Sequence, residues 1–371
     1  MEEFSAMKNG LLLVPFMTGK GGTETVIKNL FTAYHHSTVQ PDYRLRVYSI
    51  GGSNDYAWAR PAKEVTIKHI SRRRMVRTLY YLTCLPGYLF RVIKRERPDF
   101  IISTNPVMWF LSYRIAHLLK LKTRVIAWYH YSLKRKPVRP LFLHAADDYL
   151  AISDAISTEL VRAGISRDHI FTIYNPITTD QTVVQRPLAG PTRFIYLGRL
   201  DLDGQKNLRD LISACRLLRG EWRLDLYGDE TKAQAVKEFV WEQQLESRIS
   251  FRGFVANPWQ QINQASALVL CSNFEGYPMV LAEAMSHGVF CIASNIDGSN
   301  ELVTPSNGSL YQLHDYQDLA TKMQAVIDAP QALPSATQIQ ETVEKLLPQE
   351  YLHRFNQAIA SILKEKDGVK L

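Results

Sequence analysis

Hydrophobic residues alternate along the chain between two kinds of segment. Short, mainly apolar runs are typical of strands that are buried on both faces of a parallel sheet. In the first half of the chain such runs lie at residues 11–16, 45–50, 100–103, 124–128 and 148–152. The stretches between several of them carry apolar residues at helical spacing, so the pattern predicts repeated strand–helix–strand units.

A second series of apolar runs follows a polar segment at residues 177–191 that contains two prolines. These runs lie at residues 193–197, 222–227, 249–251, 267–271 and 289–293. A chain of 371 residues is long for one domain, so we predict two α/β domains joined by this polar linker. We place the domains at residues 1–177 and 178–345, and we expect residues 346–371 to form a closing amphipathic helix.

Composition limits the class of protein. No stretch reaches the ~20 apolar residues of a membrane-spanning helix. The N-terminus is acidic at first and lacks a small-residue cleavage site, so it does not read as a signal peptide. The four cysteines are scattered and no pair has the spacing of metal ligands. We therefore expect a globular protein in a reducing, cytoplasmic setting, without a bound metal.

Positive charge is concentrated in one part of the chain. Residues 60–139 hold 19 Lys and Arg against three acidic residues, a local balance of +16 within a net charge of +8. Such a region is typical of proteins that meet a membrane surface, a polyanionic glycan or a nucleic acid. Within it, residues 72–97 have an apolar and aromatic middle between basic clusters, interrupted at Pro86 and Gly87. The stretch is either two helical pieces that join the core or an element that lies on an anionic membrane surface.

Two glutamates occupy a strand–loop–helix–strand unit at residues 265–303. Glu275 follows the carboxyl end of the predicted strand, where ligands of parallel sheets bind, and Glu283 lies in the following helix. The backbone N–H groups near Met279 and Val280 form the positive end of that helix and favour an anion. A ligand with hydroxyls for the carboxylates and phosphates for the helix end, such as a nucleotide-sugar, fits both features. Two solvated surface glutamates are the simpler alternative.

The amino-acid sequence of this unit, FEGYPMVLAEAMSHGVFCIAS, resembles the donor-site signature of family-4 retaining glycosyltransferases. That signature is Glu-x7-Glu, with Gly-(Tyr/Phe)-Pro after the first Glu and Glu-Ala-Met-x-x-Gly at the second, and every position matches here. The resemblance implies that Glu275 lies near the transferred sugar and that Glu283 binds the ribose hydroxyls. It also implies donor contacts from Gly276, Tyr277, Pro278, Met279 and Val280.

The resemblance also implies the fold, which in this family is the α/β GT-B fold. It consists of two Rossmann-like doubly wound domains facing a central cleft, with a C-terminal helix that crosses back to the N-terminal domain. The N-terminal domain would bind the acceptor and the C-terminal domain the nucleotide-sugar donor.

Arg199 and Lys206 flank a glycine-containing loop just before a predicted helix. Two cations near a helix start are suited to neutralise a diphosphate, although exposed surface charges are the simpler alternative. The family pattern Gly-Arg-Leu followed by Gln-Lys matches here and implies that both residues grip the donor diphosphate. The resemblance also implies that two strand ends contact the donor, one at Gly228 and one at Gly253–Phe254. The second would contact the nucleotide base of the donor.

Two features of the first domain resemble the same family. His130 follows the carboxyl end of a predicted strand; a lone histidine is usually structural, but the resemblance implies that this one approaches the transferred sugar. Gly21, Gly22 and Thr23 form a turn before a helix and lack the G-x-G-x-x-G spacing of a dinucleotide site. They resemble the family's loop that faces the cleft from the acceptor side.

The implied reaction is the retaining transfer of galactose, glucose or an N-acetylhexosamine from a UDP-sugar, without metal or cofactor. The acceptor would be a glycan or lipid-linked glycan of the cell envelope, such as lipopolysaccharide, teichoic acid or glycolipid. The sequence motifs most resemble those of the lipopolysaccharide 1,6-galactosyltransferase type.

A phosphorylase of the same fold lacks support because no lysine context for a pyridoxal cofactor is evident. A GT-B nucleotide-sugar epimerase remains open. A basic nucleic-acid- or polyanion-binding protein would explain the charge but not the glutamate pair, so we expect no nucleic-acid partner.

Overall fold

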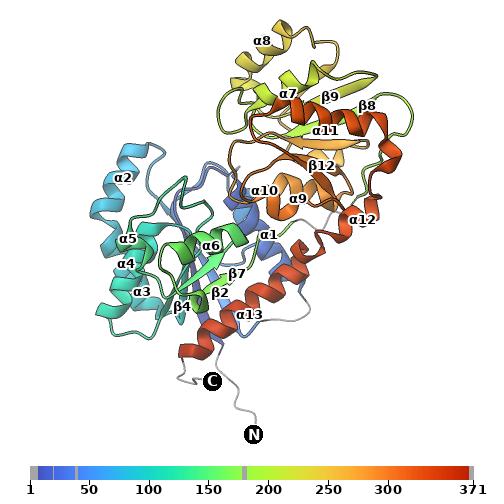
Figure 1. Cartoon of the computed structure of the whole chain (residues 1–371). Helices are drawn as coiled ribbons and strands as arrows, with labels where there is room; N and C mark the ends of the chain where they lie inside the picture. The colour runs from blue at the N-terminus through green and yellow to red at the C-terminus, as the bar shows by residue number, and fades with distance from the viewer. Residues whose placement is uncertain (1–6, 20, 38–40, 178–181, 367–371) are drawn as a thin grey trace. The chain divides into compact units, whose positions relative to one another are not determined.

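The computed structural model describes residues 7–19, 21–37, 41–177 and 182–366, and the chain divides into two compact units (Figure 1). One unit comprises Met1–Pro176 together with Pro348–Leu371, and the other comprises Ile177–Leu347. Each is built on one parallel sheet with helices in the connections.

The first unit has a seven-stranded sheet in the order β3-β2-β1-β4-β5-β6-β7. Its strands are β1 Lys8–Val14, β2 Tyr43–Gly51, β3 Val65–His69, β4 Phe100–Ser103, β5 Arg124–Ala127, β6 Asp148–Ala151 and β7 Ile170–Thr172. Its helices are α1 Gly22–His36, α2 Arg74–Thr83, α3 Leu85–Glu96, α4 Pro106–Leu118, α5 Pro140–Leu143, α6 Asp154–Arg162 and α13 Pro348–Lys366. The strand order reverses between β1 and β4, which is the switch point of a doubly wound fold.

The second unit has a six-stranded sheet in the order β10-β9-β8-β11-β12-β13. Its strands are β8 Thr192–Leu197, β9 Trp222–Tyr227, β10 Ile249–Gly253, β11 Ala267–Leu270, β12 Phe290–Ser294 and β13 Gly308–Tyr311. Its helices are α7 Leu208–Cys215, α8 Gln234–Glu242, α9 Met279–Ser286, α10 Ser299–Leu302, α11 Tyr316–Asp328 and α12 Ala336–Glu341. This order is that of a Rossmann-like sheet, so the predicted fold class is confirmed.

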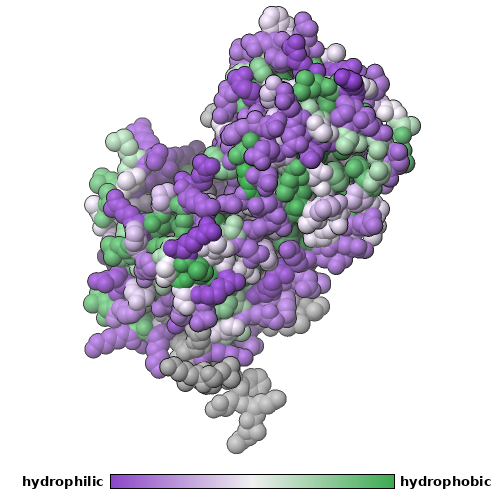
Figure 2. Space-filling model, viewed as in Figure 1, coloured by the Kyte–Doolittle hydropathy of each residue, from purple (hydrophilic) through white to green (hydrophobic). Residues whose placement is uncertain are grey.

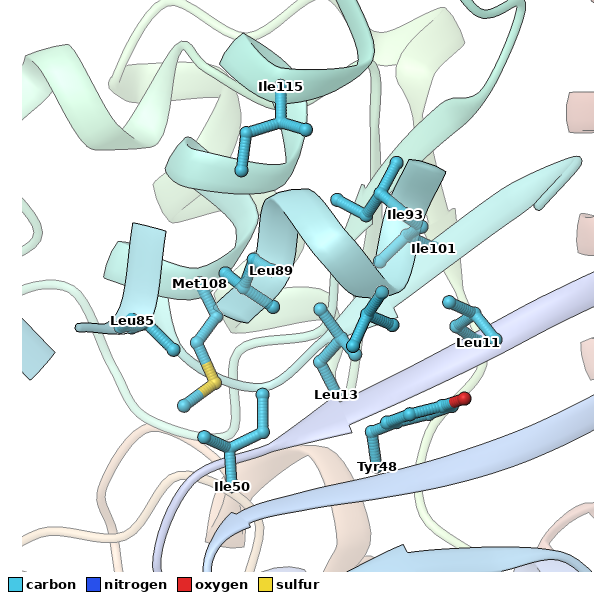
Figure 3. Close-up of a cluster of buried hydrophobic side chains, with 11 residues drawn as sticks. Leu11, Leu13, Tyr48, Ile50, Leu85, Leu89, Ile93, Ile101, Met108 and Ile115 are labelled. Carbon is cyan, nitrogen blue, oxygen red and sulfur yellow. The ribbon is translucent and has the colours of Figure 1, made fainter. Parts of the chain in front are cut away.

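One face of the first sheet is covered by α3 and α4. Leu11 and Leu13 of β1 and Ile101 of β4 contact the same buried cluster as Leu89 of α3 and Met108 of α4 (Figure 3). Alternate residues of a strand point to opposite faces, so each central strand must be apolar on both sides. This is why the strands read in the sequence as continuous apolar runs.

The closing helix, α13, packs on α1 within the first unit. Its Phe355 is fully buried, and the centroid of its ring lies 6.1 Å from that of Trp128, which follows β5. The face that carries Tyr351, Phe355 and Ile362 is buried, as the amphipathic pattern of the segment predicts.

The stretch at residues 72–97 forms two helices, α2 and α3, but the break differs from the prediction. The chain turns at Cys84, and Pro86 lies in the first turn of α3, where a missing N–H group costs no hydrogen bond. The two helices also differ in burial, because α3 buries Leu85, Leu89, Val92 and Ile93 whereas α2 buries no residue. The core interpretation therefore holds for α3, whereas α2, among the described residues, joins the core only through Tyr81, which is partly buried against it.

Two element ends in the first unit also differ from prediction. β1 ends at Val14, so Phe16 lies in the following loop rather than in the strand. α1 begins at Gly22, so Gly22 and Thr23 lie in the helix rather than in the turn predicted before it. Among the described residues, no helix is long and apolar enough to cross a membrane.

Candidate active site

Glu275 and Lys206, which are 69 positions apart, form an ion pair in the second unit. Lys206 Nζ lies 2.6 Å from Glu275 Oε1, and both side chains are largely buried, at 15% and 12% exposure. Lys206 lies in the loop between β8 and α7, and Glu275 lies in the loop between β11 and α9. β8 and β11 are neighbours in the sheet, so their carboxyl ends bring the two side chains together.

Gln205 connects this pair to Arg199. Its side-chain oxygen accepts a hydrogen bond from Arg199 Nη2 at 2.5 Å, and its side-chain N–H donates to the carbonyl of Phe274 at 3.0 Å. The Asn273 N–H also donates to the Gln205 carbonyl at 2.8 Å. Three predicted residues, Arg199, Lys206 and Glu275, therefore share one network. Gln205 was quoted in the sequence only as part of a motif, and its linking role could not be seen there.

The loop between β8 and α7, which carries Arg199 and Lys206, has a constrained backbone conformation. Asn207 adopts a left-handed conformation with φ 46°, and Asp201 Oδ1 accepts the Gly204 N–H at 3.1 Å. A Cβ at Gly228 would lie 2.1 Å from the Gly198 carbonyl oxygen, so a glycine is required where β9 ends beside this loop.

Gly228, Gly253 and Phe254 lie at the carboxyl ends of neighbouring strands. The Gly228 N–H donates to the Gly253 carbonyl at 2.9 Å, which joins the end of β9 to the end of β10. Gly253 has φ 71°, and Phe254 is 58% exposed. The predicted donor residues of these two strands are therefore adjacent to one another at the ligand-binding edge of the sheet.

The helix after Glu275, α9, begins at Met279, so its positive end lies at Met279 and Val280 as predicted. Pro278 is the N-cap of α9, and Met279 and Val280 form its first turn, whose N–H groups have no helical carbonyl behind them. Gly276 lies against Gly298, since a Cβ at Gly298 would come 3.1 Å from the Gly276 carbonyl oxygen. Tyr277 is buried. These residues form a backbone-lined helix start suited to phosphate oxygens.

Glu283 lies in the second turn of α9. Its carboxyl group is enclosed by protein, although the residue keeps some exposed surface. Burial raises the pKa of this carboxyl to about 7, and the indole of Trp259 offsets part of that effect. Such a group gains or loses its proton near neutrality and is a candidate for contact with a polar ligand. No pattern in the sequence pointed to Trp259.

Asp201 and Asp203 have the spacing Asp-x-Asp, which the expectation of no bound metal overlooked. Asp201 is engaged with the Gly204 backbone, and Asp203 pairs with Arg209. Within the described residues, no group of three or more His, Cys, Asp or Glu side chains could hold a metal ion.

His130 follows β5 in the first unit. Its ring packs against Trp128, with centroids 4.7 Å apart. Burial lowers the pKa of its imidazole to about 3, so the ring is neutral. Nε2 is buried and has no hydrogen-bond partner among the described residues. A neutral imidazole with an unsatisfied nitrogen is suited to a hydroxyl group.

Gly21 is the N-cap of α1, Gly22 and Thr23 are its first residues, and the loop before them is held by Glu24. The Glu24 carboxylate accepts hydrogen bonds from the N–H groups of Thr18 at 2.8 Å and Gly19 at 3.0 Å. A Cβ at Gly21 would lie 2.4 Å from Glu24 Oε2, whereas a Cβ at Gly22 would meet nothing within 4 Å. A side chain at position 21 would therefore need the Glu24 carboxylate to shift, whereas one at position 22 would need no change in the protein.

Two Rossmann-like units, with a Lys–Glu pair and a helix start at the ligand edge of the second, define the GT-B class of sugar-transfer enzymes. Residues 20–181 match the family model described as Glycosyltransferase Family 4, and residues 191–329 match Glycosyl transferases group 1. The chain belongs to the family-4 glycosyltransferases.

Curated relatives agree over nearly the whole chain. Lipopolysaccharide 1,6-galactosyltransferase of Escherichia coli is 28% identical, covering 94% of this chain and 97% of its own, and that of Salmonella typhimurium is 29% identical, covering 94% and 98%. The solved structure of the lipopolysaccharide outer core galactosyltransferase WaaB in its apo form has a TM-score of 0.82 at 27% identity, covering 95% of this chain and 99% of its own. Anabaena HepE in complex with UDP-glucose shares the fold, with a TM-score of 0.72 at 20% identity over 96% of this chain and 99% of its own. These likenesses do not favour the epimerase and nucleic-acid alternatives.

Proposed function

We propose that the protein transfers a hexose, with galactose as the first candidate, from a UDP-sugar to a glycan acceptor of the cell envelope. The observation that carries the proposal is the network of Arg199, Gln205, Lys206 and Glu275 at the carboxyl ends of β8 and β11, in which the Lys206–Glu275 pair is largely buried. The likeness to lipopolysaccharide 1,6-galactosyltransferases supports galactose and a lipopolysaccharide-type acceptor.

In this proposal the cations stabilise the leaving group. Negative charge grows on the diphosphate as the bond from the sugar to its oxygen breaks. Lys206, Arg199 and the N–H groups at the start of α9 provide positive charge there without a metal ion. Since Lys206 already contacts Glu275, its ammonium group would bridge the diphosphate and the carboxylate that orients the sugar.

Glu283 and His130 are assigned the remaining contacts with the donor, according to the protonation state of each side chain. Glu283 accepts hydrogen bonds from the ribose hydroxyls, and His130 meets a hydroxyl of the transferred sugar as a neutral imidazole. No residue stands out as a covalent nucleophile. The acceptor hydroxyl therefore attacks from the face that the diphosphate leaves and passes its proton to the departing phosphate oxygen. The configuration of the sugar is retained.

The test is the stereochemistry of slow donor hydrolysis. A retaining enzyme given UDP-α-galactose releases α-galactose first, which proton NMR distinguishes from the β form before mutarotation. Release of β-galactose would refute the retaining mechanism while leaving the donor assignment intact.

We also propose that α2 rests on an anionic membrane surface, on the cytoplasmic side where UDP-sugars would be used. Met75, Leu79 and Leu82 are 85%, 62% and 74% exposed, and their spacing places them on one face of the helix. Figure 2 shows hydrophobic residues at the surface of this part of the first unit, next to hydrophilic ones. Arg72 and Arg73 precede the helix, and such a combination is typical of helices that lie in the interface.

Sedimentation with vesicles tests this second proposal. The protein should bind vesicles that contain phosphatidylglycerol and not vesicles of phosphatidylcholine alone, and Leu79→Glu should abolish binding. Leu118→Glu is the matched control, because Leu118 is a 72% exposed leucine of α4. Equal binding of both variants, or no binding of the wild type, would refute the membrane role of α2.

A further inference from the structure

A pocket of the first unit lies where β1, β2 and β3 end, at the edge of the sheet where ligands bind. It encloses about 270 Å³. Its lining consists of Phe16, Gly51, Ser53, Tyr56, His69, Ile70, Ser71 and Arg72. Arg72 was noted in the sequence only as the first residue of the basic stretch at residues 72–97, and the other lining residues were not candidates, because the sheet brings them together from three separate segments.

The wall beside β2 is built tightly. Gly51 has φ 123°, and a Cβ there would lie 2.7 Å from the Tyr81 hydroxyl oxygen and 3.0 Å from Phe16. The Tyr81 hydroxyl accepts the Phe16 N–H at 3.1 Å and donates to the Ile50 carbonyl at 2.6 Å. These bonds hold the loop after β1 against the end of β2.

Tyr56 orients the imidazole of His69. The Tyr56 oxygen accepts the Ser53 N–H at 2.9 Å and lies 3.2 Å from His69 Nδ1. The Tyr56 hydroxyl can accept this hydrogen bond and donate its own proton to Nδ1 at the same time, and we assign the tautomer of His69 on that basis. This assignment puts the proton of the neutral imidazole on Nε2, where it can be donated to a ligand.

The charge of the lining is positive. Arg72 belongs to it, and Arg77 fixes the adjacent backbone by donating to the carbonyls of Ser71 at 3.0 Å and Arg72 at 2.6 Å. The Arg77 guanidinium also lies 3.8 Å from the centroid of the Phe16 ring. No carboxylate belongs to the described lining. A nucleotide ribose, which is usually held by an acidic residue at such a strand end, is therefore a poor fit.

We propose that this pocket binds the acceptor sugar and recognises an anionic group on it, such as a phosphate, through Arg72 and His69. The proposal rests on the proposed function, since it assigns the acceptor of the same reaction. The pocket also adjoins the start of α2 at Arg74. An acceptor anchored in the membrane would therefore enter next to the helix that we place on the membrane surface.

The experiment compares glucose with glucose 1-phosphate and glucose 6-phosphate, which differ from it by one phosphate. Binding to the full-length protein is measured by calorimetry for the wild type, Arg72→Gln and His69→Gln. Arg60→Gln is the matched control, because Arg60 is an exposed arginine of the same unit outside the pocket lining. At least one sugar phosphate should bind about tenfold more tightly than glucose, as charge-assisted hydrogen bonds predict. Arg72→Gln and His69→Gln should reduce that preference, and Arg60→Gln should keep it.

Equal affinity of the wild type for all three probes, or an unchanged preference in Arg72→Gln, would overturn the inference. Binding of UDP-galactose is measured on the same samples. If UDP-galactose binds while the phosphate preference is absent, the inference fails and the proposed function stands. If no UDP-sugar binds, the proposed function fails, and with it the acceptor role of the pocket.

Discussion

Lowering the pH should weaken the binding of a UDP-sugar through the protonation of Glu283. An ionised carboxylate accepts hydrogen bonds from two ribose hydroxyls, whereas a protonated carboxyl has less acceptor capacity. The pKa of this group is raised to about 7 by burial. Binding favours the ionised form, so a proton is released on binding and affinity rises with pH.

The magnitude follows from that pKa. With a pKa of about 7, the carboxyl is roughly one-tenth ionised at about pH 6 and roughly nine-tenths ionised at about pH 8. If the ionised form alone binds, the apparent affinity is reduced by the ionised fraction, so it should fall about tenfold between about pH 8 and about pH 6.

The assay is calorimetric titration with UDP-galactose, whose two phosphodiester groups do not titrate in this range, at both pH values. Glu283→Gln should bind more weakly at the higher pH and should lose the pH dependence. Equal affinity of the wild type at both pH values would refute the reasoning. A dependence that persists in Glu283→Gln would assign it to another group, with His287, which stacks on Trp259 at 4.7 Å between ring centroids, as the first to test.

Three further substitutions test the site. Glu275→Gln should lower donor turnover by about 100-fold or more and leave donor affinity nearly unchanged. The reason is that it removes the charge that pairs with Lys206 and, in the proposed mechanism, orients the sugar. Similar turnover in both proteins would contradict this role. Gly228→Ala should destabilise the protein by roughly 1–3 kcal/mol in chemical denaturation, because its Cβ would overlap the Gly198 carbonyl, and wild-type stability would show that the loop can move aside. Gly22→Ala meets no atom of the protein, so its thermal unfolding should stay near wild type while sugar transfer to an acceptor falls, and unchanged transfer would remove Gly22 from the acceptor loop.

The fold and most of the second-unit site could be predicted from the sequence for a physical reason. A strand buried on both faces must be mainly apolar, so the central strands are visible as runs of hydrophobic residues, whereas β3, which is mostly exposed, is not. The Glu275 loop and the start of α9 are local features of one continuous stretch, and their residues appear in order. The break between α2 and α3 was misplaced because Pro86 stops a helix only when it lies in the interior, and here it lies in a first turn.

Contacts between distant segments could not be predicted in the same way. The Lys206–Glu275 pair depends on β8 and β11 being neighbours, which no local pattern states. The pocket around His69 and Phe16 likewise depends on the order of β1, β2 and β3 in the sheet. The exposed face of α2 was indistinguishable in the sequence from the buried face of α3, because both are apolar stripes on amphipathic helices.

The most direct test of the central claim is a panel of nucleotide-sugars with the wild type and Lys206→Met. Binding and slow release of the nucleotide are measured with UDP-galactose, UDP-glucose, UDP-N-acetylglucosamine and GDP-mannose. The account predicts that one UDP-sugar binds and is turned over, and that Lys206→Met loses the turnover because the leaving diphosphate is no longer neutralised. Absence of binding by every nucleotide-sugar, or unchanged turnover in Lys206→Met, would contradict it.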